Sequence, residues 1–134
     1  MKEMSINRIK IDEKRSEQVI VLKEIDGNTL LPVVIGISEV NAIKLKLSGM
    51  QPPRPLTHDL LYNTIVELGG RLRRVIIDKL HNRTFFAKLV IENREGKEVS
   101  IDARPSDSIA LALRAEAPIF VNDAVLEEAG IQPS

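Results

Sequence analysis

The chain has no cysteine and no tryptophan among its 134 residues, and its aromatic side chains are one tyrosine and three phenylalanines. The lack of cysteine excludes disulfides, thiolate zinc sites and a cysteine nucleophile. So few aromatics argue against a platform on which nucleic-acid bases stack. Phe85 and Phe86 are adjacent, so a strand would point them to opposite faces. Any catalytic chemistry must therefore come from other side chains.

An excess of one charge is also missing, because 19 basic residues balance 19 acidic ones. A protein that wraps nucleic acid usually carries a basic excess, so we expect any nucleic-acid contact to be local and weak. The one asymmetry is residues 71–83. Within it, the basic strand Arg71-Leu72-Arg73-Arg74 is typical of a solvated or edge face that discourages aggregation, with a phosphate-backbone contact as the alternative. Residues 71–83 contain one acid, Asp78, and five basic residues: Arg71, Arg73, Arg74, Lys79 and Arg83.

Long apolar runs are absent as well. No run approaches the roughly 20 residues that a membrane span needs, and residues 1–7 contain no apolar signal-peptide core. We therefore expect no membrane association and a cytoplasmic location. A chain of this length forms one domain or two small half-domains, and its core needs no covalent staples.

The chain aligns with itself without gaps when its second half is laid on its first, and strand, turn and helix signals keep step throughout. Arg8–Asp12 falls on Arg74–Asp78, Val33–Ile35 on Val99–Ile101, and Ile43–Leu47 on Ile109–Leu113. A long period seen twice predicts a duplicated half-domain, with halves of about 4–69 and 70–130. The alternative is two unrelated halves that share common β and α patterns.

Each half has a β-β-β-α-α pattern. Runs rich in isoleucine and valine predict strands, glycines and polar turns separate them, and apolar spacing of three and four predicts the helices. The expected strands are 5–12, 18–25, 30–35, 72–80, 84–91 and 98–102, and 117–121 is a short extended segment. The expected helices begin near Ser38, Thr57, Ser106 and Ala124. The third is apolar nearly all round, so we expect it to be buried. Strands grouped before helices predict an α+β fold, one compact domain with a mixed or antiparallel sheet.

Two helix starts share a motif in which Arg-Pro precedes an acid of the first turn. They are Arg54-Pro55-Leu56-Thr57-His58-Asp59 and Arg104-Pro105-Ser106-Asp107. Proline prepares the turn into a helix, and Thr57 and Ser106 could cap the first-turn amides. Such termini attract anions, and arginine can hold a phosphate through two hydrogen bonds.

The first motif contains one of the chain's two histidines. His58 could act as a general base or metal ligand while Arg54 holds a phosphoryl oxygen. The alternative is an exposed histidine of no special role beside a local Arg54–Asp59 ion pair. For the second motif, the alternative is that Arg104 pairs with Asp107 or Asp102 and only fixes the turn.

A metal site is a further possibility at these helix starts. The same self-alignment places Asn41 on Asp107, and Glu39 lies two positions before Asn41. If three helix starts converge, Glu39, Asp59 and Asp107 could share a divalent cation. Hard oxygen ligands suit Mg²⁺ or Mn²⁺.

The chain resembles the bifunctional nuclease domain family, over roughly Met4 to Gly130. The resemblance is carried by four spaced blocks: Leu31–Gly36, Pro53–Leu61, Asp102–Ala112 and Ala117–Val121. It implies an α+β fold, a homodimer, and a nuclease or phosphodiesterase acting on DNA or RNA. By matching the blocks, it draws attention to Arg54, His58, Asp59, Arg104, Ser106 and Asp107, with Glu39 as an addition.

Three hypotheses follow. In the first, His58 or a metal on Asp59 and Asp107 activates water, while Arg54 and Arg104 stabilise charge on the phosphoryl oxygens. In the second, the Arg-Pro helix starts of a dimer hold an anionic small molecule, such as a nucleotide or carboxylate metabolite, without turnover. In the third, the motifs are architectural and the protein is a dimeric adaptor.

Overall fold

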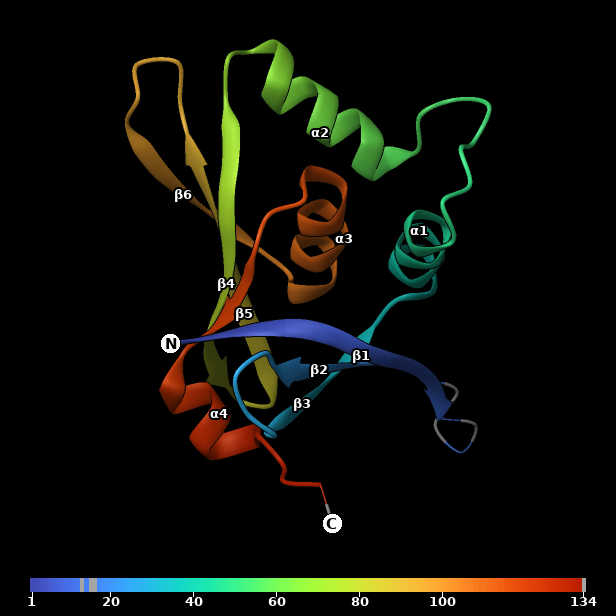
Figure 1. The fold of residues 1–134 in the computed structure, drawn as a ribbon, viewed down its shortest axis with the longest axis vertical. Helices are drawn as coiled ribbons and strands as arrows, with labels where there is room; N and C mark the ends of the chain where they lie inside the picture. Colours follow the sequence, from blue (N-terminus) through green and yellow to red (C-terminus); the bar gives the residue numbers. More distant parts are fainter. Residues whose placement is uncertain (13, 15–16, 134) are drawn as a thin grey trace.

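The computed structural model describes residues 1–12, 14 and 17–133. In this part of the chain, seven strands form one sheet in the order β3-β2-β1-β7-β4-β5-β6 (Figure 1). The strands are β1 (Lys2–Asp12), β2 (Glu17–Glu24), β3 (Leu30–Ile35), β4 (Arg71–His81), β5 (Thr84–Glu92), β6 (Glu98–Ala103) and β7 (Ile119–Val121). The helices are α1 (Ile37–Ser48), α2 (Thr57–Glu67), α3 (Pro105–Ala115) and α4 (Asp123–Ala129). The chain is thus an α+β protein with a mixed sheet, as the sequence predicts.

The sheet consists of two antiparallel three-stranded units joined by a short central strand. β7 pairs antiparallel with β1 and parallel with β4. Residues 117–121 were expected only as an extended segment, yet this segment completes the sheet between the two units. The second half is therefore β-β-β-α-β-α, one strand more than the expected pattern. The central strand joins both units into one continuous hydrogen-bonded layer.

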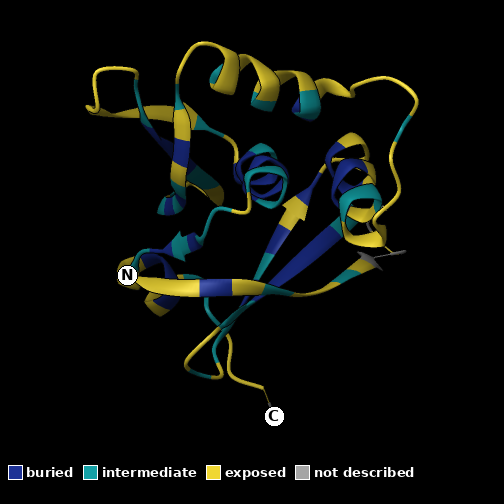
Figure 2. Cartoon of the chain, turned by 45° about the horizontal axis from the view of Figure 1, so that its top comes forward, coloured by how far each residue is buried: buried dark blue, intermediate teal, exposed yellow. Residues whose placement is uncertain are grey.

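Helix α3 is the centre of the molecule. It packs against α1, α2, β3, β4 and β5, and its Ser108, Ile109, Leu111 and Ala112 are fully buried. Figure 2 shows this helix as the dark-blue element enclosed by the others. The prediction of a buried third helix is confirmed, because a helix apolar on nearly every side must be covered on nearly every side.

The two halves are in a register different from the one the sequence suggests. Helix α1 begins at Ile37 and α3 at Pro105, whereas the gap-free alignment would place Ile37 on Ala103. Glu39 is therefore the structural counterpart of Asp107, and the expected match of Asn41 with Asp107 is wrong. The segments that connect the elements differ in length between the two halves, so a single gap-free shift cannot align all the corresponding elements. The corresponding strands accordingly begin at unequal intervals: Lys2 and Arg71, Glu17 and Thr84, and Leu30 and Glu98.

Helix α2 lies across α3 at the rim and is largely exposed (Figures 1 and 2). Its apolar side chains do not pack fully: Leu61 is 40% exposed, and the C-cap residue Leu68 is 71% exposed. His58 is the buried residue of this helix, although the sequence treats an exposed histidine as the simpler case. Among the described residues, no helix combines the length and apolar character that a membrane crossing requires.

The expected hydroxyl caps do not form. Leu56 and Arg104 occupy the N-cap positions of α2 and α3, and neither helix has a side-chain cap hydrogen bond at that position. Thr57 and Ser106 lie inside the helices, at the first and second positions after the N-cap. Proline is favoured at the first helical position, and Pro105 occupies it in α3, so the N-cap falls on Arg104.

Candidate functional site

Three helices begin near one another, and one chain of polar contacts joins their first turns. Glu39 lies in the first turn of α1, His58 in that of α2 and Asp107 in that of α3. Arg104, the residue before α3, connects two of them. We call Glu39, Arg104, Asp107 and His58 the polar chain.

The polar chain has well-formed geometry. His58 Nε2 lies 2.9 Å from Asp107 Oδ1. Arg104 donates a hydrogen bond from Nε to Asp107 Oδ2 at 2.9 Å, and its Nη2 lies 2.8 Å from the same oxygen as an ion pair. Arg104 Nη2 also donates to Glu39 Oε1. A carboxylate paired with arginine is a hydrogen-bond acceptor, so the proton between Asp107 and His58 belongs on Nε2. The other ring nitrogen, Nδ1, then carries a lone pair.

Burial differs along the polar chain. The side chains of His58 and Glu39 are 11% and 8% exposed, whereas Arg104 is 67% exposed. Hydrogen bonding and charge attraction from Asp107, followed by the charge of Glu39, raise the pKa of the Arg104 guanidinium above its ordinary value. With a neutral imidazole, two carboxylates and one guanidinium carry a net charge of minus one.

A cavity of about 450 Å³ adjoins the polar chain, between α2, α3 and strands β5 and β6. His58, Arg104 and Asp107 line it together with apolar side chains, among them Leu61, Ile65 and Ile101. A few polar groups in an apolar cavity of this size are typical of small-molecule and active sites. We call it the His58 cavity.

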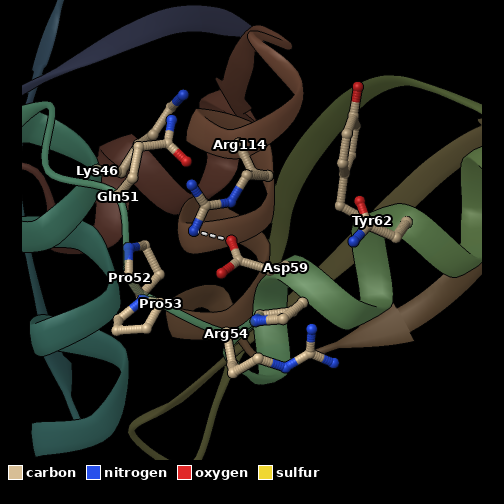
Figure 3. Close-up of a pocket in the computed structure, with 10 residues that line it drawn as sticks. Lys46, Gln51, Pro52, Pro53, Arg54, Asp59, Tyr62 and Arg114 are labelled. Carbon is tan, nitrogen blue, oxygen red and sulfur yellow. Dashed lines mark ion pairs between the residues drawn. The ribbon is translucent and has the colours of Figure 1, made fainter.

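Asp59 and Arg54 lie elsewhere, in a second cavity of about 310 Å³ (Figure 3). Asp59 Oδ2 accepts a hydrogen bond from the Leu56 amide at 2.9 Å, and its Oδ1 contacts Arg114. The local Arg54–Asp59 ion pair that the sequence offered as an alternative does not form between these two described residues. Figure 3 shows the Arg54 guanidinium extending away from the Asp59–Arg114 pair. Asp59 thus stabilises the helix start and binds Arg114, and it does not join the polar chain.

Ser106 faces a third space. It is buried, and it lines a cavity of about 460 Å³ with Gly36, Arg83 and Phe85. Arg104 borders this cavity as well as the His58 cavity. The structure therefore brings together Glu39, His58, Arg104 and Asp107, places Ser106 in a different cavity that Arg104 also borders, and separates Arg54 and Asp59 from this set.

The shared divalent-cation site expected from Glu39, Asp59 and Asp107 does not fit this arrangement. Arg104 lies between the carboxylates of Glu39 and Asp107, and Asp59 is held by Arg114. Within the described residues, no three histidine, aspartate or glutamate side chains gather as metal ligands would.

Sequence reasoning missed Arg114. It lies in the last turn of α3, where a basic residue is favoured by the helix dipole without any partner. Nothing local indicates that it would meet Asp59, which lies in the first turn of α2. Only the crossing of α2 over α3 brings the two side chains together.

Comparison with known proteins gives a consistent family match. The model of the family described as "Bifunctional nuclease domain" matches residues 20–134. An uncharacterised protein of Mycobacterium tuberculosis is 42% identical over 98% of this chain and 77% of its own length. Bifunctional nuclease 1 of Arabidopsis thaliana is 31% identical over 77% of this chain and 33% of its own length. Bifunctional nuclease 1 of Oryza sativa subsp. indica is 25% identical over 92% of this chain and 38% of its own length.

Proposed function

Because the chain belongs to the bifunctional nuclease domain family, we propose that it hydrolyses phosphodiester bonds of DNA or RNA with His58 at the reacting centre. One observation carries this proposal. A buried histidine is hydrogen-bonded to an acid on another helix, and both line a cavity. A base oriented by a second group is the arrangement that general-base catalysis requires.

In the proposed reaction, the free nitrogen Nδ1 of His58 takes a proton from water. The water oxygen attacks phosphorus, and the bond from phosphorus to the leaving sugar oxygen breaks. The proton then passes from the imidazolium to the leaving oxygen. Asp107 keeps the ring in the required tautomer and stabilises the transient imidazolium, as acids paired with catalytic histidines do.

Arg104 supplies the positive charge. Its Nε and Nη2 are engaged by carboxylates, whereas Nη1 has no hydrogen-bond partner among the described residues. The side chain is 67% exposed, so Nη1 can donate to a phosphoryl oxygen at the edge of the His58 cavity. Charge that develops on this oxygen during attack would be stabilised there.

Hydrolysis of fluorogenic single-stranded DNA and RNA by His58→Gln and Asp107→Asn tests this proposal. We expect each variant to lose about 10²- to 10⁴-fold in kcat/KM, the usual contribution of a positioned base. His81→Gln is the matched control, because His81 is exposed at the end of β4. Each protein is measured with EDTA, with Mg²⁺ and with Mn²⁺, after urea unfolding has shown that it is folded.

Equal hydrolysis by the original protein and His58→Gln would mean that the activity comes from elsewhere, including from a contaminating nuclease. Strict dependence on an added cation, with no effect of Asp107→Asn, would also refute the role given to the polar chain. Loss of activity in His81→Gln to the same degree would remove the specificity of the result.

A further inference from the structure

Another flank of α2 borders two further cavities besides the His58 cavity. Two cavities of about 310 Å³ each adjoin there, and Tyr62 lines both. The residues of α2 divide between the flanks: His58, Leu61 and Ile65 face the His58 cavity, while Tyr62 and Val66 face this second side. We call the two adjoining cavities the Tyr62 groove.

The Tyr62 groove concentrates positive charge in a chain whose net charge is zero. Its basic residues are Lys46, Arg54, Arg114, Arg71 and Arg73, and its acids are Asp59 and Glu116. Arg114 neutralises Asp59. Lys46, Arg54 and Arg71 make no ion pair within the described residues. The groove therefore has a local excess of three positive charges, which favours a polyanion.

The cations without an ion pair in the described part of the chain come from α1, from the loop before α2 and from β4. Lys46 comes from the last turn of α1 and Arg54 from the loop before α2. Arg71 and Arg73 come from the start of β4, where the pairing with β5 shifts between Leu72 and Arg74. A bulge of this kind redirects a side chain. Arg71 and Arg73 of the basic run thus line a cavity, whereas Arg74 pairs with Glu98, so a solvated or edge face describes the run only in part.

The groove also offers flat apolar and amide groups. The half-buried Tyr62 lines both parts of the groove, and Pro52, Pro53 and Pro118 are also among the lining residues. Figure 3 shows the Tyr62 ring projecting from α2, with Pro52 and Pro53 on the other side of the Asp59–Arg114 pair. Gln51 and Asn63 add hydrogen-bonding amides. A bare polyphosphate would use only the cations, whereas a nucleotide strand uses phosphate, base face and base edge together.

We infer that the Tyr62 groove binds single-stranded nucleic acid, with Arg71, Arg73 and Arg54 on phosphates and one base against Tyr62. Duplex bases are stacked on each other, so a lone aromatic ring favours an unpaired strand. The groove and the His58 cavity flank the same first turn of α2. A strand held in the groove would extend around this turn toward His58. Delivery of the bound strand to His58 rests on the proposed function, whereas binding of the strand in the groove does not.

Fluorescence anisotropy with a short labelled single-stranded DNA, in EDTA, tests the inference. The slope of log affinity against log salt is negative, and the joint variant Arg71→Gln with Arg73→Gln should make it less steep by about 1.4. Each phosphate contact contributes about 0.7 to the steepness for a single strand. Tyr62→Leu should weaken binding by roughly tenfold without changing the slope, and Tyr62→Phe should bind normally, because the ring stacks with or without its hydroxyl.

Arg8→Gln with Lys10→Gln is the matched control, because it removes the same charge from exposed positions of β1 outside the groove. A slope change in this control equal to that of Arg71 and Arg73 would overturn the inference. So would unaltered affinity in Tyr62→Leu, or displacement by inorganic polyphosphate or duplex DNA as effective as by single strands. Binding without hydrolysis would refute the proposed function alone, and hydrolysis without binding in the groove would refute this inference alone.

Discussion

Removing the Arg104 guanidinium should destabilise the protein chiefly through Glu39. Arg104→Met retains most of the aliphatic stem and deletes the charge. It leaves the Glu39 carboxylate, whose side chain is 8% exposed, without the one hydrogen-bond donor that it has in the described structure. A buried charge stripped of its partner costs about 3–5 kcal/mol, and an exposed pair contributes only about 0.2–1 kcal/mol.

The expected cost lies between these limits. Arg104 is 67% exposed, so solvent already screens the pair and water can partly replace the guanidinium. We therefore expect Arg104→Met to lose about 2 kcal/mol of unfolding free energy. With a urea slope of about 2 kcal/mol/M, the unfolding midpoint would fall by about 1 M. Urea denaturation followed by circular dichroism resolves this change.

A second substitution isolates the buried charge. Glu39→Gln should partly rescue Arg104→Met, making the double variant about 1 kcal/mol more stable than Arg104→Met alone, because a buried amide costs less than a buried carboxylate. Arg74→Met is the control, since its partner Glu98 is 46% exposed, and the loss of an exposed pair should be much smaller than that in Arg104→Met. If Glu39→Gln adds to the destabilisation instead, the carboxylate is solvated and the reasoning fails.

Three other predictions concern packing, backbone and charge. Leu111→Ala removes a fully buried side chain of α3 and should cost about 2–5 kcal/mol in urea unfolding, the range for such truncations. Gly69→Ala should be costlier than Gly49→Ala: both glycines have positive φ, but only at Gly69 would a Cβ approach another side chain, Arg94 Nε at 2.8 Å. The hydrogen bond from Arg74 lowers the pKa of Glu98, so its stabilising effect is present above the unfolded pKa and is lost as pH falls through the folded pKa. NMR titration should show a higher Glu98 pKa in Arg74→Gln.

Local pattern predicted the elements of this fold well, because each expected strand and helix has a counterpart in the structure. The short central strand is the informative exception. The segment 119–121 is too short to carry a strand pattern, and its pairing with β1 and β4 depends on strands that lie far away in the sequence. An extended conformation can be inferred from so short a segment, but a place in the sheet cannot.

The candidate site was predicted in its residue types and only partly in its partners. His58 and Asp107 are distant in sequence and meet through the packing of α2 on α3. Asp59 adjoins His58 in sequence, yet it points to the other flank of the helix and meets Arg114. One step along a helix turns a side chain by roughly 100°, so neighbours within one motif separate into different cavities.

The polar chain depends on an asymmetry between the two halves. Glu39 and Asp107 occupy equivalent first-turn positions of α1 and α3, and the residue before each helix is Gly36 in one case and Arg104 in the other. Gly36 has an ordinary φ of −77°, so conformation does not demand glycine there. A Cβ at Gly36 would lie 2.6 Å from Glu39 Oε2, whereas its absence leaves room for the carboxylate beside the helix start. Arg104, at the matching position, has the length to reach both acids. Gly36 leaves room for the Glu39 carboxylate, and Arg104 provides the cation that contacts both Glu39 and Asp107. The two helix starts are joined in one polar chain for this reason.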